Sequence, residues 1–399
     1  MKFAVWISFN YSPRVGGSFS YSDRLIKSID SYTFAEGIDV CFATTYFTQI
    51  GSLNRDVVRI GSPFELILSK IPFIAKNRRF QGLMWKLFNH KYKKYLKNNG
   101  IKILFYSSQF DKYVKDFPFI APHWDIAHRS TYAFPEFSIV LQDWRDKYYS
   151  NFLPRALMVF VESNAGKEEL IKYTNLNEER IKVVPIFAGE CASYNISQEE
   201  QDRIISQLGL TRHKYFFYPA QFIAEKNHFN VLKAFSVFVK DHPDYKLIFT
   251  GNSPDELLGN IEYIKQSALT MGIADKVVFG GFVPLETIYC LYKNACAHIM
   301  ASYVGPTNMP PLEAMTLGCP VICTDLSGHQ EEMQDAALYF DAKNPNQLSE
   351  RMREMSENRN LYVQKINNRL KTSEFTIENA LNRINEHFIE ASKIRSAWE

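Results

Sequence analysis

The 399-residue sequence lacks several features that would assign it to a particular class of protein. No apolar run reaches the length of about 20 residues that a transmembrane helix needs. The apolar start, residues 1–10, turns polar too quickly for a signal peptide and is better explained as a buried first strand. The formal net charge of only +3 gives no general support for a nucleic-acid partner. We therefore expect a cytoplasmic protein that contacts a membrane, if at all, from its surface.

Metal-binding and disulfide patterns are absent as well. The six cysteines form no C-x-x-C pair and no cluster with histidine at zinc spacing, so the sequence indicates neither a zinc site nor a disulfide framework. A reducing cytoplasm fits this cysteine usage best. Cys319 and Cys323 lie in an apolar segment, where we predict small buried thiols.

What is present is an alternation of short apolar runs and helical patterns, typical of α/β domains with parallel sheets. The chain is too long for one core and is predicted to form two domains. Residues 1–187 would form the first, with a glycine turn at Gly16 and Gly17 between its opening strand and a helix over 21–38. Residues 188–375 would form the second, whose first strand starts at 215 and which includes a helix over 255–271. The helical residues 376–399 would pack back on the first domain.

The segment 297–323 carries the clearest indication of a binding site. It is predicted as strand, loop, helix and strand, and Thr307 and Asn308 suit the N-cap of that helix, followed by prolines that a first helical turn tolerates. The free amides at such a helix start bind anions, and Glu313 in the same helix can accept hydrogen bonds from ribose hydroxyls. This combination indicates a nucleotide diphosphate site. The alternative is that Glu313 only complements the helix dipole and the prolines only start the helix.

Residues 66–97 combine lysines and arginines with interleaved aromatic side chains, including Trp85 and Phe88. Basic and aromatic residues at helical spacing suit an anionic membrane interface. A solvated basic helix face covering the domain core would give the same pattern, and the sequence leaves both interpretations open.

Several ordered motifs make the second half similar to glycosyltransferase family 4, a group of retaining enzymes with two facing Rossmann-like domains, the GT-B fold. The matching segments of the second half are 217–221, 225–228, 279–283, 309–323, 327–332 and 336–340. In the first half, Gly16-Gly17 and the segments 124–128 and 161–163 match more loosely. The resemblance thus covers nearly the whole chain and is strongest from 215 to 345.

The resemblance implies roles for individual residues. Lys226 stands where the family lysine neutralises the diphosphate of the donor, and a cation there would stabilise the charge on the leaving group. Glu313 stands where a family glutamate holds the ribose, and His128 resembles the histidine that reaches across the cleft toward the transferred sugar. The remaining implied donor-binding residues are Gly16, Gly17, Gln221, Phe282, Val283, Thr307, Asn308, Met309 and Pro310.

Two positions depart from the family pattern. Gln221 stands where the family has an arginine, so Lys226 would offset the phosphate charge nearly alone. Gly305 stands where the family has its first glutamate, which contacts the donor sugar. Asn308 or Thr307 would supply hydrogen bonds in its place, and the donor sugar is left open.

The resemblance implies transfer of a hexose or deoxyhexose, with retention, from a nucleotide-diphosphate sugar to a glycan acceptor. We expect a lipid-linked intermediate of bacterial surface polysaccharide, such as O-antigen or capsule, at the inner face of the plasma membrane, and no nucleic acid. The chain has no Asp-x-Asp sequence, so with Lys226 and a helix end at the diphosphate we expect no cofactor and no metal requirement. The alternatives are a nucleotide-sugar epimerase of the same fold, or a non-catalytic sugar- or protein-binding module.

Overall fold

The computed structural model describes residues 1–8, 11, 17–71, 77–111, 113–131, 133–137, 139–253 and 259–398. Its first sheet has seven parallel strands in the order β3-β2-β1-β4-β5-β6-β7. The strands are β1 (Lys2–Trp6), β2 (Asp39–Thr45), β3 (Val57–Ile60), β4 (Ile103–Tyr106), β5 (Phe119–His123), β6 (Met158–Val161) and β7 (Ile181–Val183).

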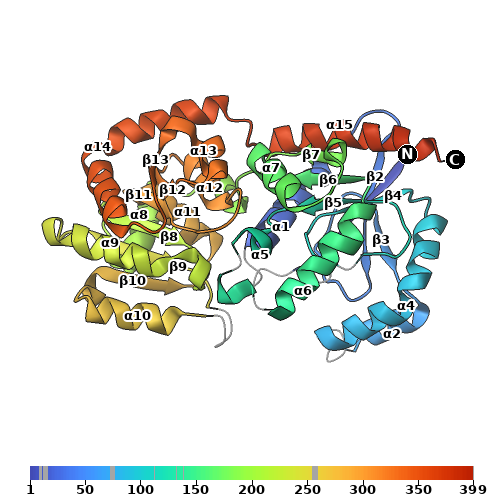
Figure 1. Cartoon of the computed structure of the whole chain (residues 1–399), viewed down its shortest axis with the longest axis horizontal. Helices are drawn as coiled ribbons and strands as arrows, with labels where there is room; N and C mark the ends of the chain where they lie inside the picture. Colours follow the sequence, from blue (N-terminus) through green and yellow to red (C-terminus); the bar gives the residue numbers. More distant parts are fainter. Residues whose placement is uncertain are drawn as a thin grey trace.

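The second sheet has six parallel strands in the order β10-β9-β8-β11-β12-β13. These are β8 (Tyr215–Pro219), β9 (Lys246–Thr250), β10 (Val277–Gly281), β11 (Ala297–Met300), β12 (Val321–Thr324) and β13 (Ala337–Phe340). Figure 1 shows the two sheets in separate halves that lie side by side. This is the predicted α/β class, with one doubly wound parallel sheet in each half.

Helices cover both sheets. Those of the first half are α1 (Gly17–Ser31), α2 (Pro63–Ser69), α4 (Arg78–Asn98), α5 (Ala127–Ser130), α6 (Ile139–Lys147) and α7 (Asn164–Tyr173). Those that follow are α8 (Gln198–Gln207), α9 (His228–Asp241), α10 (Ile261–Thr270), α11 (Leu285–Asn294), α12 (Met309–Thr316), α13 (Ser327–Met333), α14 (Pro345–Thr372) and α15 (Ile377–Ser396). Within the described ranges, no helix has both the length and the apolar content needed to cross a membrane.

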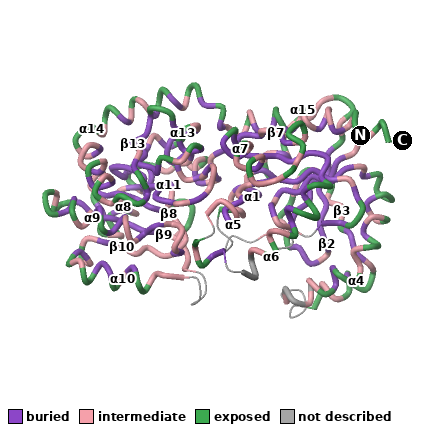
Figure 2. Tube along the Cα trace, in the orientation of Figure 1, coloured by how far each residue is buried: buried purple, intermediate pink, exposed green. Residues whose placement is uncertain are grey.

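The strands are short and almost wholly apolar because helices bury them on both faces. Tyr215, Phe216 and Phe217 in β8 are each fully buried, and Figure 2 shows the buried positions gathered along the two sheets. The six cysteines are all free and buried, as expected for Cys319 and Cys323.

The last helix, α15, follows the second half in the chain but packs on the first half (Figure 1). The ring of Phe388 stacks on that of Phe3 in β1, with centroids 4.2 Å apart and planes within 3°. At the far edge of the same sheet, Lys182 forms an ion pair of 2.7 Å with Glu390. The helix therefore completes the core of a sheet whose strands lie far from it in sequence.

Some predicted helix ends are wrong. Helix α1 begins at Gly17, which the sequence placed in a turn, and it ends at Ser31 instead of 38. Arg55 explains the early end, because its Nε donates a hydrogen bond of 2.9 Å to the carbonyl of Ile29 in the last turn of the helix. The helix expected over 255–271 is observed from Ile261 to Thr270, and residues 254–258 lie outside the described part.

Candidate active site

The carboxyl ends of neighbouring parallel strands meet at one edge of the second sheet, where ligands bind in open α/β folds. Strand β8 leads into Gln221, and its neighbour β9 leads into Gly251 and Asn252. A Cβ atom at Gly251 would lie 2.2 Å from the carbonyl oxygen of Ala220, and its φ is 141°. Only glycine therefore allows the two chain segments to approach this closely at the strand ends.

A cleft with a volume of ≈ 490 Å³ opens at this edge and is lined from both halves of the molecule. It brings together several residues that the resemblance assigned to donor binding: Gly17, Gln221, Phe282, Val283 and Glu313. Phe282 is 60% exposed, so its ring is free to contact a ligand. Gly16 lies outside the described residues.

Glu313 is held in the wall of the cleft by donors from two segments. The hydroxyl of Tyr292 in α11 donates to its Oε2 at 3.0 Å. Burial raises the pKa of Glu313, while hydrogen bonds from Tyr292, the Cys191 thiol and the backbone of Gly189 act in the opposite direction. A Cβ atom at Gly189 would lie 2.3 Å from Oε1, so the close approach of this segment requires glycine. The carboxyl group is thereby fixed in position in a residue that lines the cleft and is partly exposed.

The start of α12 differs from the sequence-based prediction. Asn308 occupies the N-cap position but its side chain makes no capping hydrogen bond. Its Nδ2 instead donates to Nε2 of His329 at 2.9 Å, and the hydroxyl of Thr307 donates to Oε2 of Glu162 at 2.6 Å. Because both side chains are engaged in these contacts, neither caps α12. The first turn of the helix, which begins with Met309 and Pro310, therefore has no side-chain cap.

Lys226 lies at the same strand-end edge but is not among the residues lining the cleft. Its Nζ donates to Oγ of Ser302, just after β11, at 3.3 Å and forms an ion pair of 3.1 Å with Glu225. Burial lowers the pKa of His329 to about 4, and the charge of Lys226 adds to this effect. His329 contacts Asn308 at the N-cap of α12. The positive charge of Lys226 is therefore felt near the start of this helix.

The structure does not bring His128 to the cleft. Its Nε2 lies 3.2 Å from Oδ1 of Asp146, and its ring stacks on Tyr149 with centroids 5.2 Å apart. Burial lowers the pKa of His128, although the carboxylate of Asp146 acts in the opposite direction. In this conformation the imidazole is engaged within the first half and does not reach toward Glu313.

Three histidines of the second half, His228, His298 and His329, are fully buried. His228 is fully buried and stacks on Phe222, and His298 is fully buried within β11. His329 is also fully buried, with Nδ1 2.9 Å from the carbonyl oxygen of Thr324.

Sequence reasoning missed several polar residues that line the cleft, among them Asp23, Glu190, Asn252 and Glu286. Asn252 could have been found, because it directly follows a strand end. Asp23 and Glu190 carry no local signal and are brought in from the first half and the junction segment. Two cations outside the lining pair with them, Lys27 with Asp23 at 2.9 Å and Arg24 with Glu190 at 3.0 Å.

Among the described residues, no lysine or arginine lines the cleft. Over the part of the chain that the structure describes, no three His, Cys, Asp or Glu side chains are grouped so that they could hold a metal ion.

Comparison with known proteins finds a family match in the second half of the chain. The family model "Glycosyl transferases group 1" matches residues 200–372. An uncharacterized glycosyltransferase of Methanocaldococcus jannaschii is 26% identical over 208 residues, 51% of each chain. O-antigen chain mannosyltransferase B of Escherichia coli is 23% identical over 212 residues, 52% of this chain and 53% of that protein. The chain thus spans about half the length of the curated relatives it matches.

The fold is shared over the full length with solved structures. Anabaena HepE, solved in complex with UDP and glucose, superposes with a TM-score of 0.69 at 15% identity and covers 97% of this chain and 99% of its own. Residues 200–372 thus match the glycosyl transferases group 1 model, and the whole chain shares the GT-B fold of two parallel-sheet halves with these solved structures.

Proposed function

We propose that the protein is a retaining glycosyltransferase that moves a hexose or deoxyhexose from a nucleotide-diphosphate sugar to a glycan acceptor. The observation that carries this proposal is the cleft between the two halves, which gathers Gln221, Phe282, Val283 and Glu313 at the strand ends of the second sheet. Two of the relatives are O-antigen chain mannosyltransferases, and this similarity supports transfer of a hexose.

In the proposed complex, the nucleobase lies against the exposed ring of Phe282 and beside Val283. Glu313 lines the cleft, and its carboxyl group, held by Tyr292, accepts hydrogen bonds from the ribose hydroxyls. The diphosphate lies toward the uncapped start of α12, whose helix dipole favours an anion. The solved complexes of HepE, which shares this fold, with UDP and with UDP-glucose support a nucleotide ligand.

The reaction requires stabilisation of the negative charge that develops on the leaving nucleoside diphosphate. Lys226 supplies the positive charge, and its ammonium group donates a hydrogen bond to Ser302 at this edge. Gln221 contributes hydrogen bonds without charge, and Glu313 fixes the nucleoside end, which positions the anomeric carbon for attack. We propose front-face attack assisted by the departing phosphate, with closure of the two halves excluding water.

His128 completes the proposed catalytic set, and its role requires a rearrangement. Its imidazole has to leave the hydrogen bond with Asp146 before it faces the transferred sugar. Closure of the halves over the donor is the step at which we place this change.

We further propose that the acceptor is lipid-linked and that the protein docks on an anionic membrane through α2 and α4. Large apolar side chains project into solvent there: Phe64, Leu66, Ile67, Ile71, Leu83 and Leu87, from 38% to 61% exposed. Exposed lysines flank them at 86, 91, 94 and 97. We call these apolar and basic residues the α2–α4 face. Its combination of apolar and basic groups suits the headgroup region of an anionic bilayer.

The test of the donor site is a thermal-shift and calorimetric screen against UDP, GDP, dTDP and CMP, alone and as sugar conjugates. A ligand that binds only the folded state raises the melting temperature by mass action. We expect one nucleotide to stand out, with the shift and the turnover lost in Lys226→Ala and retained in Lys240→Ala, an exposed lysine at the end of α9. No response to any nucleotide would refute the proposal and favour a non-catalytic binding module.

A further inference from the structure

A series of buried hydrogen bonds joins Lys226 to the start of α12. The Lys226 ammonium donates to Oγ of Ser302, and the carbonyl oxygen of Ser302 accepts a hydrogen bond of 3.0 Å from the Thr324 hydroxyl. Thr324 ends β12, the strand paired with β11, and the helix that follows, α13, carries His329. Ser302, Thr324 and His329 are all fully buried. The series therefore links two parts of the proposed donor site that lie far apart in the sequence.

The surroundings of His329 determine which ring nitrogen carries its hydrogen. Nδ1 lies 2.9 Å from the carbonyl oxygen of Thr324, which can only accept, so the hydrogen is on Nδ1. The Thr324 hydroxyl, 3.1 Å from Nδ1, already donates to Ser302 and therefore accepts from the ring as well. Burial lowers the pKa of His329 to about 4, which keeps the ring neutral. Nε2 is then a free acceptor, in agreement with the hydrogen bond that it receives from Nδ2 of Asn308.

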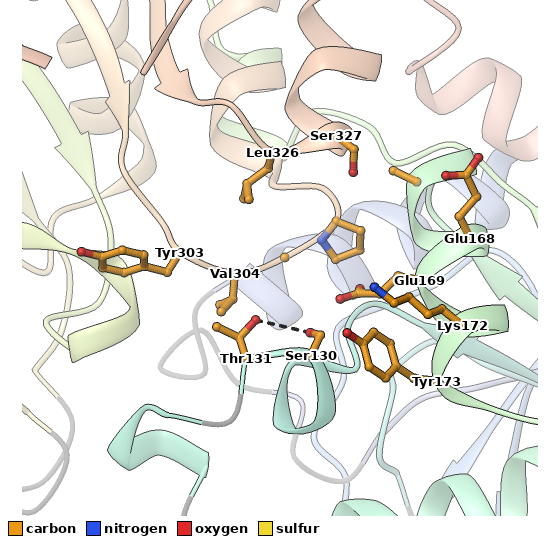
Figure 3. A pocket seen from close by; sticks show the side chains of 13 residues that line it. Ser130, Thr131, Glu168, Glu169, Lys172, Tyr173, Tyr303, Val304, Leu326 and Ser327 are labelled. Atoms are coloured by element: carbon orange, nitrogen blue, oxygen red, sulfur yellow. Dashed lines mark hydrogen bonds between the residues drawn. The ribbon is translucent and has the colours of Figure 1, made fainter. Parts of the chain in front are cut away.

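The start of α13 packs directly on the loop that leads into α12. A Cβ atom at Gly328 would lie 1.0 Å from the carbonyl oxygen of Pro306, so only glycine allows this approach. Figure 3 shows Leu326 and Ser327, the two residues before it, lining one cavity together with this loop. Backbone packing therefore holds the imidazole of His329 at a fixed place beside the start of α12.

The contact with His329 decides what Asn308 does at the helix start. An asparagine at an N-cap position ordinarily accepts a hydrogen bond from a backbone N–H of the first turn. Asn308 has the extended backbone of an N-cap residue, with φ −143° and ψ 133°, yet its side chain makes no capping hydrogen bond. Because its amide is bound to His329, the first-turn N–H groups of α12 are left open for a ligand. Without this contact, the Asn308 side chain would be free to turn onto the helix and occupy them.

We propose that His329 is a positioning residue of the donor site, which keeps the Asn308 amide off the start of α12 and so leaves the helix N–H groups available to the diphosphate. His329 acts through Asn308 and does not itself touch the donor. This inference rests on the proposed function, because the diphosphate is the group that those N–H groups would bind. Through Thr324, the same imidazole also supports Ser302, which the Lys226 ammonium contacts.

The test compares ligands with and without phosphate groups. Dissociation constants of UDP, GDP and dTDP are measured by calorimetry, and those of uridine, guanosine and thymidine by ligand-observed NMR. His329→Phe removes both polar contacts of the ring and keeps a planar ring in its place, whereas His329→Gln keeps an acceptor near the position of Nε2. For the diphosphate that binds the wild type, we expect His329→Phe to weaken binding about tenfold, the size expected for one lost hydrogen bond to a charged group. Binding of the matching nucleoside should change less than about twofold, because the nucleoside makes no such bond.

Two further variants serve as controls for the substitution at the ring. His329→Gln should bind the diphosphate within about threefold of the wild type, because its side chain can still accept from Asn308. His242→Phe makes the same change at the C-cap of α9, and it should bind both ligands as the wild type does.

A second pair of variants tests the same step without altering the buried ring. Asn308→Ser is too short to reach His329 but can cap α12, and Asn308→Ala can do neither. We expect Asn308→Ser to bind the diphosphate about fivefold more weakly than Asn308→Ala, since only the hydroxyl occupies a first-turn N–H. In the Asn308→Ala background, His329→Phe should have no further effect on diphosphate binding, because its effect passes through Asn308. If His329→Phe does not fold, the comparison of Asn308→Ser with Asn308→Ala still decides.

The outcomes separate this inference from the proposed function. If the wild type binds a diphosphate and His329→Phe binds it equally well, or Asn308→Ser and Asn308→Ala bind it equally well, the role of His329 is refuted and the proposed function stands. An equal loss of nucleoside and diphosphate binding would mean that the ring only supports the fold, and it would also refute the role. If the wild type binds none of the diphosphates, the proposed function fails and this inference fails with it.

Discussion

Replacement of Glu162 by glutamine tests a buried contact between the two halves. Glu162 directly follows β6, is 8% exposed, and accepts the hydrogen bond from the Thr307 hydroxyl at 2.6 Å. Burial raises its pKa from the ordinary 4.5 to about 8, the Thr307 hydrogen bond acts in the opposite direction, and the charge of Asp125 adds to the rise. The folded protein therefore holds a proton on this carboxyl group at neutral pH.

The sign of the effect on stability follows from proton linkage. Between pH 4.5 and about 8 the folded state keeps the Glu162 proton, while the unfolded chain has lost it. The free energy of unfolding that this group contributes is fully present below pH 4.5 and is lost as the pH rises through about 8. At about 1.4 kcal/mol for each pH unit between the two pKa values, the loss is on the order of 3–5 kcal/mol.

The assay is urea unfolding of wild type and Glu162→Gln at several pH values from 5 to 8.5, followed by circular dichroism and tryptophan fluorescence. Glutamine keeps the acceptor for Thr307 but cannot ionise, so the variant should lose less stability than the wild type as the pH rises. Glu332 is fully buried and also has a pKa raised, first by burial and then by the charge of Glu162. Glu162→Gln removes that second contribution, so any change at Glu332 adds to the expected difference with the same sign. Glu178→Gln, at a carboxyl group that is 65% exposed, should behave as wild type.

Parallel pH profiles for wild type and Glu162→Gln would refute this reasoning. They would mean that the carboxyl group is ionised in the folded protein, and hence that water or a cation reaches the contact between the halves.

Three further outcomes are expected. Phe388→Ala removes the ring stacked on Phe3 and should lower the free energy of unfolding by about 3–5 kcal/mol, measured in urea; a change below 1 kcal/mol would contradict the packing of α15. Glycosyl transfer should be retained when EDTA is added to the enzyme and its substrates, and its loss would contradict metal independence. The protein should float with anionic liposomes, and Ile67→Glu should abolish flotation, whereas Leu269→Glu, at an equally exposed leucine on α10, should not. Failure of the wild type to float would remove the membrane proposal.

Much of the fold was predictable because it depends on local patterns. Short apolar runs separated by helical periods predicted the parallel sheets, and the strand–loop–helix pattern of residues 297–323 located the start of α12, while Gln221 was assigned by the resemblance. The resemblance located Glu313, Phe282 and Val283, which the structure gathers in one cleft. These features follow from chain order and need no knowledge of distant contacts.

The errors arise where distant segments decide the structure. Helix α1 ends early because Arg55, 26 residues beyond Ile29, caps it. Thr307 and Asn308 do not cap α12, because Glu162 and His329 offer them other partners. No local pattern could reveal these pairs. The same holds for Asp23 and Glu190, which reach the cleft only through the meeting of the two halves.

The stacking of Phe388 on Phe3 has a consequence for biosynthesis. Strand β1 leaves the ribosome long before α15, the helix that covers it, because the two lie far apart in the sequence. At 5–20 residues per second, the nascent chain carries this uncovered apolar surface for roughly 20–80 s. The second half can fold during that interval, but the first cannot close its core until α15 has been synthesised. A chain stopped short of residue 377 would keep that surface exposed permanently, which makes it a candidate for chaperone binding or degradation.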